Sequence, residues 1–256
     1  MYPYLRLGPF LLQLPLLILL IGVWICSALS EKEAARLKLP PGIVSNMIFI
    51  GLIAGIVGAR LAYAARYLNA YLDNPLGLFS LNLNTLADSE GLLVGLVIAV
   101  LYGWRKKLPL RPTLDALAPG LAAFMVALGL AHILSGDAFG APANLPWSIY
   151  LWGEYRHPSQ IYETLAALGI FVIAYKKPFG QAGNGLNFLL VVALSSAARL
   201  FLEAFRGDSL IFAEGFRAAQ VVNLFILAVA LITMNVWARA TKTDTAPDEI
   251  LVNGLK

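Results

Sequence analysis

The chain has 256 residues, of which 59% are hydrophobic and 13% are charged. An ordinary soluble domain carries roughly 45–50% apolar and about 25% charged residues, so a water-soluble globule is excluded. We interpret the net charge of +4 as an orientation signal in a membrane protein and expect no nucleic-acid partner.

Seven apolar spans follow one another along the chain. A membrane helix needs about 20 residues to cross roughly 30 Å of hydrocarbon, and runs of this length are unlike the short alternating strands of a barrel. We place the spans at residues 8–29, 42–65, 91–104, 113–134, 160–175, 184–205 and 217–238. The predicted fold is all-α, a polytopic transmembrane bundle of about seven helices. We expect one domain over residues 1–240 and a polar cytoplasmic tail over 241–256.

Basic residues predict the orientation of the bundle. Loops rich in Lys and Arg stay on the cytoplasmic side of a membrane, and every second loop here is basic. The basic set comprises Lys32, Arg36, Lys38, Arg105, Lys106, Lys107, Arg111, Lys176, Lys177, Arg239, Lys242 and Lys256. The opposite loops are nearly bare. We therefore expect the N-terminus outside and the C-terminus inside.

Ionisable side chains inside or beside the apolar spans carry the functional signal. Each costs at least about 2.5–3.5 kcal/mol at the bilayer centre, so each should face a partner or a wet cavity. The set comprises Arg60, Arg66, Asp115, Glu163, Arg199, Glu203, Arg206 and Arg217. Cys26 is the single cysteine, which excludes an internal disulfide and a cysteine-based metal cluster. We expect no metal and no cofactor.

Arg199, Glu203 and Arg206 form the sharpest group. Their spacing of four and then three residues places all three on one face of the sixth predicted helix. A guanidinium donates two parallel hydrogen bonds to phosphate oxygens, so this stripe predicts a phospholipid site near the outer leaflet. The alternatives are a salt bridge that only pins helices together and snorkelling of Arg206 to the head groups.

Arg60 ends a stretch of small residues in the second predicted helix. Gly51, Gly55 and Gly58 form a face on which another backbone can approach closely. We expect Arg60 to face a phosphate, with interfacial snorkelling as the alternative.

A dense polar segment stands where the fourth loop enters the fifth predicted helix. It consists of His157, Pro158, Ser159, Gln160, Ile161, Tyr162 and Glu163. Ser159 can cap the helix, with Tyr162 and Glu163 in its first turn. A cap needs one residue, whereas five polar side chains converge here, so the segment also suggests a binding site.

Together these residues resemble the prolipoprotein diacylglyceryl transferases of bacteria. The likeness covers most of the chain and runs through Gly8-Pro9, Gly58-Ala59-Arg60-Leu61-Ala62-Tyr63, Asn74-Pro75-Leu76, Leu78-Phe79, Asp115, Ala118-Pro119, Ser135-Gly136-Asp137-Ala138-Phe139-Gly140, Arg156 to Glu163, and Arg199, Glu203 and Arg206. The resemblance implies transfer of a diacylglyceryl group from phosphatidylglycerol to a lipoprotein cysteine. It also implies an outer-leaflet site in the plasma membrane, with phospholipid and a prolipoprotein signal peptide as partners.

The resemblance also implies roles for single residues. Arg199 and Arg206 would clamp the departing phosphate, Glu203 would hold one of them in place, and Arg60 would add positive field. The remaining substrate-binding candidates are Asp137, His157, Ser159, Gln160, Tyr162 and Glu163.

The chain departs from the family pattern at several motif positions. Glu90 stands where the family has a histidine, Gly129 where it has an arginine, and Pro15 and Ser195 where it has tyrosines. His132 and Ser135 stand where it has asparagines, and Asp137 stands for the carboxylate of its Asn-Gly-Glu segment. Because only the thiolate is a good nucleophile, the reaction needs a base. Glu90 could serve if desolvated, and His132 is the second candidate. Their alternatives are a solvated helix-terminal charge for Glu90 and a helix-to-helix hydrogen bond for His132.

These departures motivate a second hypothesis of a different class. The chain would be a non-catalytic, lipid-binding paralogue that acts as a subunit or scaffold among other membrane subunits. A small transporter is a third and weaker hypothesis, because no pair of broken helices or two-half symmetry appears in the sequence.

Overall fold

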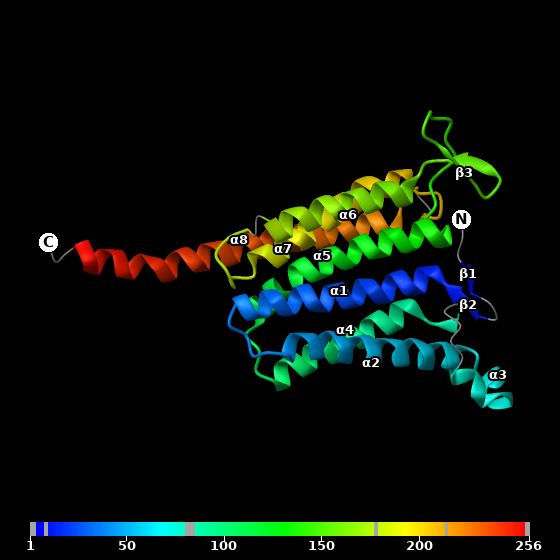
Figure 1. Cartoon of the computed structure of the whole chain (residues 1–256). Coiled ribbons are helices and arrows are strands. Elements are labelled where there is room, and N and C mark those ends of the chain that lie inside the picture. The colour runs from blue at the N-terminus through cyan, green and yellow to red at the C-terminus, as the bar shows by residue number, and fades with distance from the viewer. Residues whose placement is uncertain (1–3, 8–9, 80–84, 177–178, 213–214, 254–256) are drawn as a thin grey trace. The chain divides into compact units, whose positions relative to one another are not determined.

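The structure is a computed structural model that describes residues 4–7, 10–79, 85–176, 179–212 and 215–253 (Figure 1). The described residues form seven long helices: α1 (Leu14–Arg36), α2 (Ile43–Arg66), α4 (Asp88–Arg105), α5 (Leu110–Ser135), α6 (Ser159–Lys176), α7 (Leu186–Leu202) and α8 (Ala218–Asn253). Each predicted span coincides with one of them, which confirms the all-α class. Five of these helices, α1, α2, α5, α7 with the turn after it, and α8, are long and apolar enough to cross a membrane. The chain is a multi-pass membrane protein.

The ends of the predicted spans differ from the helix boundaries. Helix α1 begins at Leu14 rather than at residue 8, because β1 (Tyr4–Leu7) and β2 (Phe10–Gln13) form an antiparallel hairpin before it. Pro15 stands in the first turn of α1, where a missing backbone N–H breaks no helical hydrogen bond. Gly8-Pro9 lies outside the described residues. Helix α8 continues beyond residue 240 to Asn253, through most of the predicted tail.

Short elements fill the connections. Helix α3 (Leu68–Asp73) and the 3-10 helix η1 (Pro75–Phe79) follow α2, and the antiparallel strands β3 (Ile149–Leu151) and β4 (Glu154–Arg156) lie between α5 and α6. The 3-10 helix η3 (Glu203–Phe205) ends α7. The chain divides into two compact units, one of residues 1–38 and 110–256 and the other of residues 39–109.

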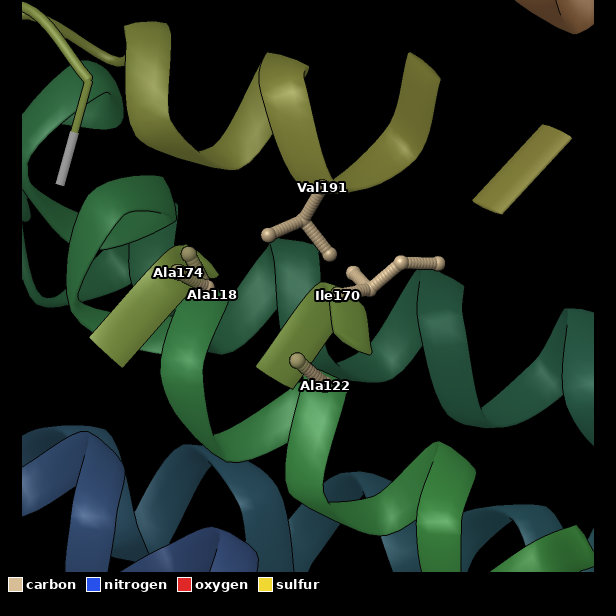
Figure 2. Packing of buried hydrophobic residues seen from close by; sticks show 5 residues of the cluster. All are labelled: Ala118, Ala122, Ile170, Ala174 and Val191. Carbon is tan, nitrogen blue, oxygen red and sulfur yellow. The ribbon is translucent and has the colours of Figure 1, made fainter. Parts of the chain in front are cut away.

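The first unit is built around α5. This helix packs against α1, α6 and α7, and α8 packs against α7. Figure 2 shows the buried centre of this packing, where α5, α6 and α7 contribute Ala118, Ala122, Ile170, Ala174 and Val191. Four of the five side chains are alanine or valine, so the helices approach one another closely.

Asp115 binds backbone amides at the N-terminal end of α7 in this unit. Its carboxylate accepts backbone hydrogen bonds from Gly185 at 2.8 Å and Phe188 at 3.1 Å. These amides begin α7 and have no partner inside the helix, so Asp115 caps α7 from the neighbouring helix. The charge of Asp115 is therefore structural.

The second unit is held by glycines, as the sequence predicted. A Cβ on Gly95 would lie 2.7 Å from the carbonyl oxygen of Gly51, and a Cβ on Gly91 would lie 2.8 Å from that of Gly55. Contacts this short leave no room for a side chain, so α2 and α4 pack backbone against backbone.

Candidate functional site

The polar residues of the first unit gather where α5 and α7 end and α6 begins. The segment after α5 pairs with the segment after η3, because the amide of Ala141 donates to Phe205 O and the amide of Gly207 to Phe139 O, both at 2.8 Å. A Cβ on Gly140 would meet the carbonyl oxygen of His157 at 2.0 Å, so only glycine fits there. The contacts hold the α5–α6 and α7–α8 connections together beside the N-terminal end of α1 (Figure 1).

A cavity of about 80 Å³ opens among α5, α6 and α7. At roughly 10–15 Å³ for one water-sized group, it has room for about five to eight such groups. Its polar lining comes from Ser159, Glu163, Ser195, Arg199, Glu203 and Arg206, and its apolar lining from Met125, Leu128, Ala138, Ala166, Ala167, Ile170, Ala198 and Leu202. The cavity therefore offers charge and an apolar wall together, as an amphiphilic ligand requires.

Glu163 connects three helices at this cavity. One carboxylate oxygen, Oε1, accepts a hydrogen bond from Arg199 Nη1 at 2.5 Å, and the other, Oε2, lies 3.1 Å from His132 Nδ1. The side chains of Glu163 and His132 are 20% and 22% exposed, so this array is largely shielded from solvent. Three residues predicted separately from the sequence thus form one contact group.

Arg199, Glu203 and Arg206 do line one cavity, but they do not form a stripe on one helix. Helix α7 ends at Leu202, Glu203 lies in η3, and Arg206 follows with extended backbone at φ −81° and ψ 142°. The predicted geometry was wrong because the helix tightens into a 3-10 turn before Arg206. The backbone bridge between Arg206 and Gly140 then directs the chain toward the α5–α6 connection.

Two of the three guanidinium nitrogens of Arg206 have a carboxylate partner, and the third has none among the described residues. Its Nε and Nη2 donate to the two carboxylate oxygens of Asp208 at 2.9 and 2.8 Å. Partial burial alone would raise the pKa of Asp208, but the Arg206 guanidinium holds that pKa below its ordinary value. The remaining nitrogen, Nη1, is buried and has no hydrogen-bond partner among the described residues.

Glu203 is the most deeply buried acid of the site, with 3% of the residue exposed. Its Oε2 lies 3.9 Å from Arg206 Nε and accepts no hydrogen bond from the described residues. The acceptor Glu203 Oε2 and the donor Arg206 Nη1 thus both lack a hydrogen-bond partner among the described residues, and both side chains line the same cavity. Such atoms are costly unless a ligand or water completes them.

Arg217 holds this segment in place from the start of α8. Its Nη1 donates to the carbonyl oxygens of Glu203 at 2.6 Å and Arg206 at 2.7 Å, and to Ser209 Oγ at 2.8 Å. The intramembrane charge predicted for Arg217 is therefore satisfied by backbone, and it fixes the two residues that face the cavity.

The polar segment at the start of α6 is more structural than predicted. Ser159 Oγ donates to the carbonyl of Ala138 at 2.6 Å instead of capping α6, and Gln160 Nε2 donates to the carbonyl of Asp137 at 3.1 Å. The predicted cap was wrong because α6 begins at Ser159 itself, whereas a capping residue precedes the first helical residue. Asp137 itself is exposed.

His157 and Tyr162 make aromatic contacts around the start of α6. The His157 ring lies edge-on to Phe205 at 5.2 Å and to Tyr162 at 6.2 Å between centroids. Tyr162 accepts a hydrogen bond of 2.8 Å from the Trp147 indole. His157 Nδ1 and Gln160 Oε1 are buried with no hydrogen-bond partner in the described part of the chain.

Arg60 and Glu90 belong to the second unit. Arg60 donates to Thr85, through both its carbonyl and its hydroxyl oxygen, and so holds the residues before α4. Glu90 pairs with Arg66 and accepts a hydrogen bond from Ser89 at 2.8 Å. Its side chain is 37% exposed, so the desolvation that would make Glu90 a strong base is not found.

Two of the positions that depart from the family pattern, Gly129 and Ser195, have structural roles. A Cβ on Gly129 would lie 2.4 Å from Thr164 Oγ1 and 3.0 Å from Thr164 Cα, so no larger side chain fits between α5 and α6. Ser195 Oγ donates to the carbonyl of Val191 within α7 at 2.6 Å. The described residues contain no group of three His, Cys, Asp or Glu that could hold a metal ion.

Sequence reasoning missed two residues of this site. Asp208 holds Arg206, and its position two residues beyond that arginine was the available signal. Arg217 was recognised as a membrane charge but was not placed at the site, because its acceptors are carbonyl groups that a sequence does not reveal.

Comparisons with known proteins match this chain to one family. The model of the prolipoprotein diacylglyceryl transferase family matches residues 4–236. A phosphatidylglycerol–prolipoprotein diacylglyceryl transferase of Nostoc sp. is 27% identical over 88% of this chain and 85% of its own. Proteins of the same name from Clostridioides difficile, 27% identical over 79% of this chain and 82% of theirs, and Synechococcus sp., 28% identical over 85% and 86%, are also similar.

Proposed function

Because this chain belongs to the prolipoprotein diacylglyceryl transferase family, we propose that it moves a diacylglyceryl group from phosphatidylglycerol to a prolipoprotein cysteine. The predicted orientation puts the cavity at the outer leaflet of the bacterial plasma membrane. The signal peptide of the prolipoprotein would bring the thiol to the same level. The observation that carries the proposal is a cavity with an apolar wall whose polar lining includes both Arg199 and Arg206.

The charges of the cavity suit a lipid phosphate. Arg199 and Arg206 both line the cavity, and the Arg199 side chain is 38% exposed. Two guanidiniums can bind the phosphodiester and stabilise the second negative charge that develops as the phosphate leaves. Asp208 and Glu163 keep these guanidiniums oriented, and the apolar wall from α5 to α7 receives the start of the acyl part.

A cell-based assay tests this proposal. The chain is expressed in bacteria depleted of their resident transferase, and the lipid content of a lipoprotein cysteine is measured by mass spectrometry. We expect a diacylglyceryl mass increase with the unchanged chain and none with R206Q. Absence of the lipid with an inserted, folded chain would contradict the proposal.

The packing at Gly129 favours a second candidate function. Thr164 fills the space that a side chain at position 129 would need, so this chain lacks the arginine that the family has there. A non-catalytic paralogue that binds phospholipid as a subunit or scaffold of a membrane complex would need Arg199 and Arg206 but no base. Bound phospholipid and a stable partner on purification, without lipid transfer, would identify this function.

A further inference from the structure

The thiol that attacks the lipid needs a base, and one array in the first unit has the geometry of one. His132 on α5, Glu163 on α6 and Arg199 on α7 are joined through the two oxygens of a single carboxylate, at 3.1 Å and 2.5 Å. The position of His132 is one where the family resemblance implies asparagine, so this array is a property of the present chain.

The contact at Nδ1 determines what His132 can do. A neutral imidazole that donates its Nδ1 proton to a carboxylate keeps the lone pair of Nε2 available to accept a proton. The carboxylate also stabilises the imidazolium that forms. A carboxylate and an imidazole from the protein, with a thiol from the substrate, make the same sequence of groups as a nucleophilic triad.

Glu90, the other candidate base, lacks these features. Its carboxylate is paired with Arg66 and is 37% exposed, so it is well solvated and ionised at neutral pH. The hydrogen bond from Ser89 and the ion pair with Arg66 lower the pKa of the Glu90 carboxyl. A carboxylate with a lowered pKa takes a thiol proton poorly, because general bases work best near the operating pH.

We propose, on the basis of the proposed transferase function, that His132 is the catalytic base and that Glu163 is its positioning residue. His132 Nε2 takes the proton from the cysteine S–H. The thiolate forms a C–S bond with the glyceryl carbon of the lipid, and the C–O bond to phosphate breaks. The bonding electron pair leaves on the phosphate oxygen of glycerol phosphate, which then takes the proton from the imidazolium.

Glu163 also connects the base to the lipid. When a phosphate anion binds Arg199, the guanidinium shares its positive charge between that anion and Glu163. The carboxylate is then freer to stabilise a positive imidazolium at His132. Lipid binding thereby favours proton removal from the thiol, so the base acts when the lipid is in place.

A pH profile of transfer tests the assignment. The charged groups that act on this array are Glu163 and, through it, Arg199, Arg206 and Asp208. The full chain is reconstituted in phosphatidylglycerol vesicles, and transfer to a cysteine peptide with a lipobox is measured from about pH 6 to pH 9.5. A free thiol with a pKa near 8.5 is about 3% thiolate at pH 7.

H132N should therefore lose roughly 30-fold at pH 7 and approach the unchanged chain at about pH 9.5, where the thiol ionises without a base. H132Q repeats the test if H132N does not fold. E163Q should show the same pH-dependent loss, because a neutral amide cannot stabilise the imidazolium. E154Q is the matched control, since Glu154 is exposed on β4 and pairs with Arg156.

The outcomes separate the assignment from the proposed function. Transfer by H132N that is reduced equally at every pH would overturn the assignment and leave the transferase function standing. No transfer by the unchanged chain at any pH would overturn both. A loss that disappears as the pH rises, with E154Q unaffected, would support the assignment.

Discussion

Each unit of the chain holds an arginine–glutamate pair between two helices, and the two pairs differ in their surroundings. Arg199 and Glu163 line a cavity and have His132 as a third member. Arg66 and Glu90 are 58% and 37% exposed, and they meet at the end of α2 and the start of α4. The first pair, with side chains 38% and 20% exposed, is therefore less accessible to solvent than the second.

The difference shows why residue type alone does not identify a site. An exposed ion pair contributes about 0–1 kcal/mol because water screens it, whereas charges in a shielded cavity act strongly on each other and on a ligand. We therefore propose that the Arg199–Glu163 pair, and not the Arg66–Glu90 pair, takes part in the transfer reaction. The second pair joins the ends of α2 and α4.

Replacing the arginine of each pair should separate them most clearly. R199Q removes a phosphate donor and leaves Glu163 with His132 only, so we expect transfer to fall by about 10²–10³-fold. R66Q is the matched change in the second unit and should cost less than about 3-fold. The rates are measured with reconstituted protein in phosphatidylglycerol vesicles. Equal losses in the two variants would break the comparison.

Arg217 should have the next largest effect. R217Q loses the charged donor that joins the Glu203 and Arg206 carbonyls to Ser209. Hydrogen bonds to charged groups are worth about 1.5–3 kcal/mol, so we expect roughly a 10-fold lower kcat/KM. The melting temperature should also fall. An unchanged transfer rate with a lowered melting temperature would show that the hydrogen bonds of Arg217 stabilise the fold only.

The glutamate of the exposed pair should have a smaller effect. E90Q keeps the size of the side chain and removes only a solvated charge, so transfer should change by less than about 2-fold. The measurement is the pH profile used for His132. A loss that recovers at high pH would place the base on Glu90 and contradict our assignment.

The smallest expected effect is on stability at low pH. The pKa of Asp208 is held below its ordinary value in the folded chain, so ionised Asp208 stabilises the fold above about pH 4, the ordinary pKa of Asp. This contribution is lost as the pH falls through the lowered pKa. The melting temperature of D208N should therefore lie slightly below that of the unchanged chain at pH 7 and converge with it in acid. A constant difference would contradict the ion pair.

Much of the fold followed from the sequence because apolar length is a strong signal in a membrane. Every predicted span coincides with a helix, and the small-residue face at Gly51 and Gly55 packs as expected. The boundaries were harder to predict. Strands β1 and β2 are rich in leucine and so extend the apolar run of the helix after them. The 3-10 turn at Glu203 continues a helical pattern without a proline or glycine to mark it.

The site was predictable as a set of residues but not as a set of contacts. Arg199, Glu203 and Arg206 were found from their spacing, yet the partner of Arg199 is Glu163, 36 positions earlier. Ser159 and Gln160 donate to backbone carbonyls, and such acceptors exist at every residue. Pairing across helices depends on tertiary packing, which spacing along one helix does not encode.

The most direct measurement is transfer by the purified chain itself. The protein is reconstituted in vesicles of phosphatidylglycerol and incubated with a lipobox peptide, and the cysteine is examined by mass spectrometry. We predict a diacylglyceryl group attached through a thioether, released glycerol phosphate in equal amount, and about 10²–10³-fold less of both products with R199Q. Phosphatidylglycerol bound tightly to folded protein, with the cysteine left unmodified, would contradict the account and identify a lipid-binding subunit.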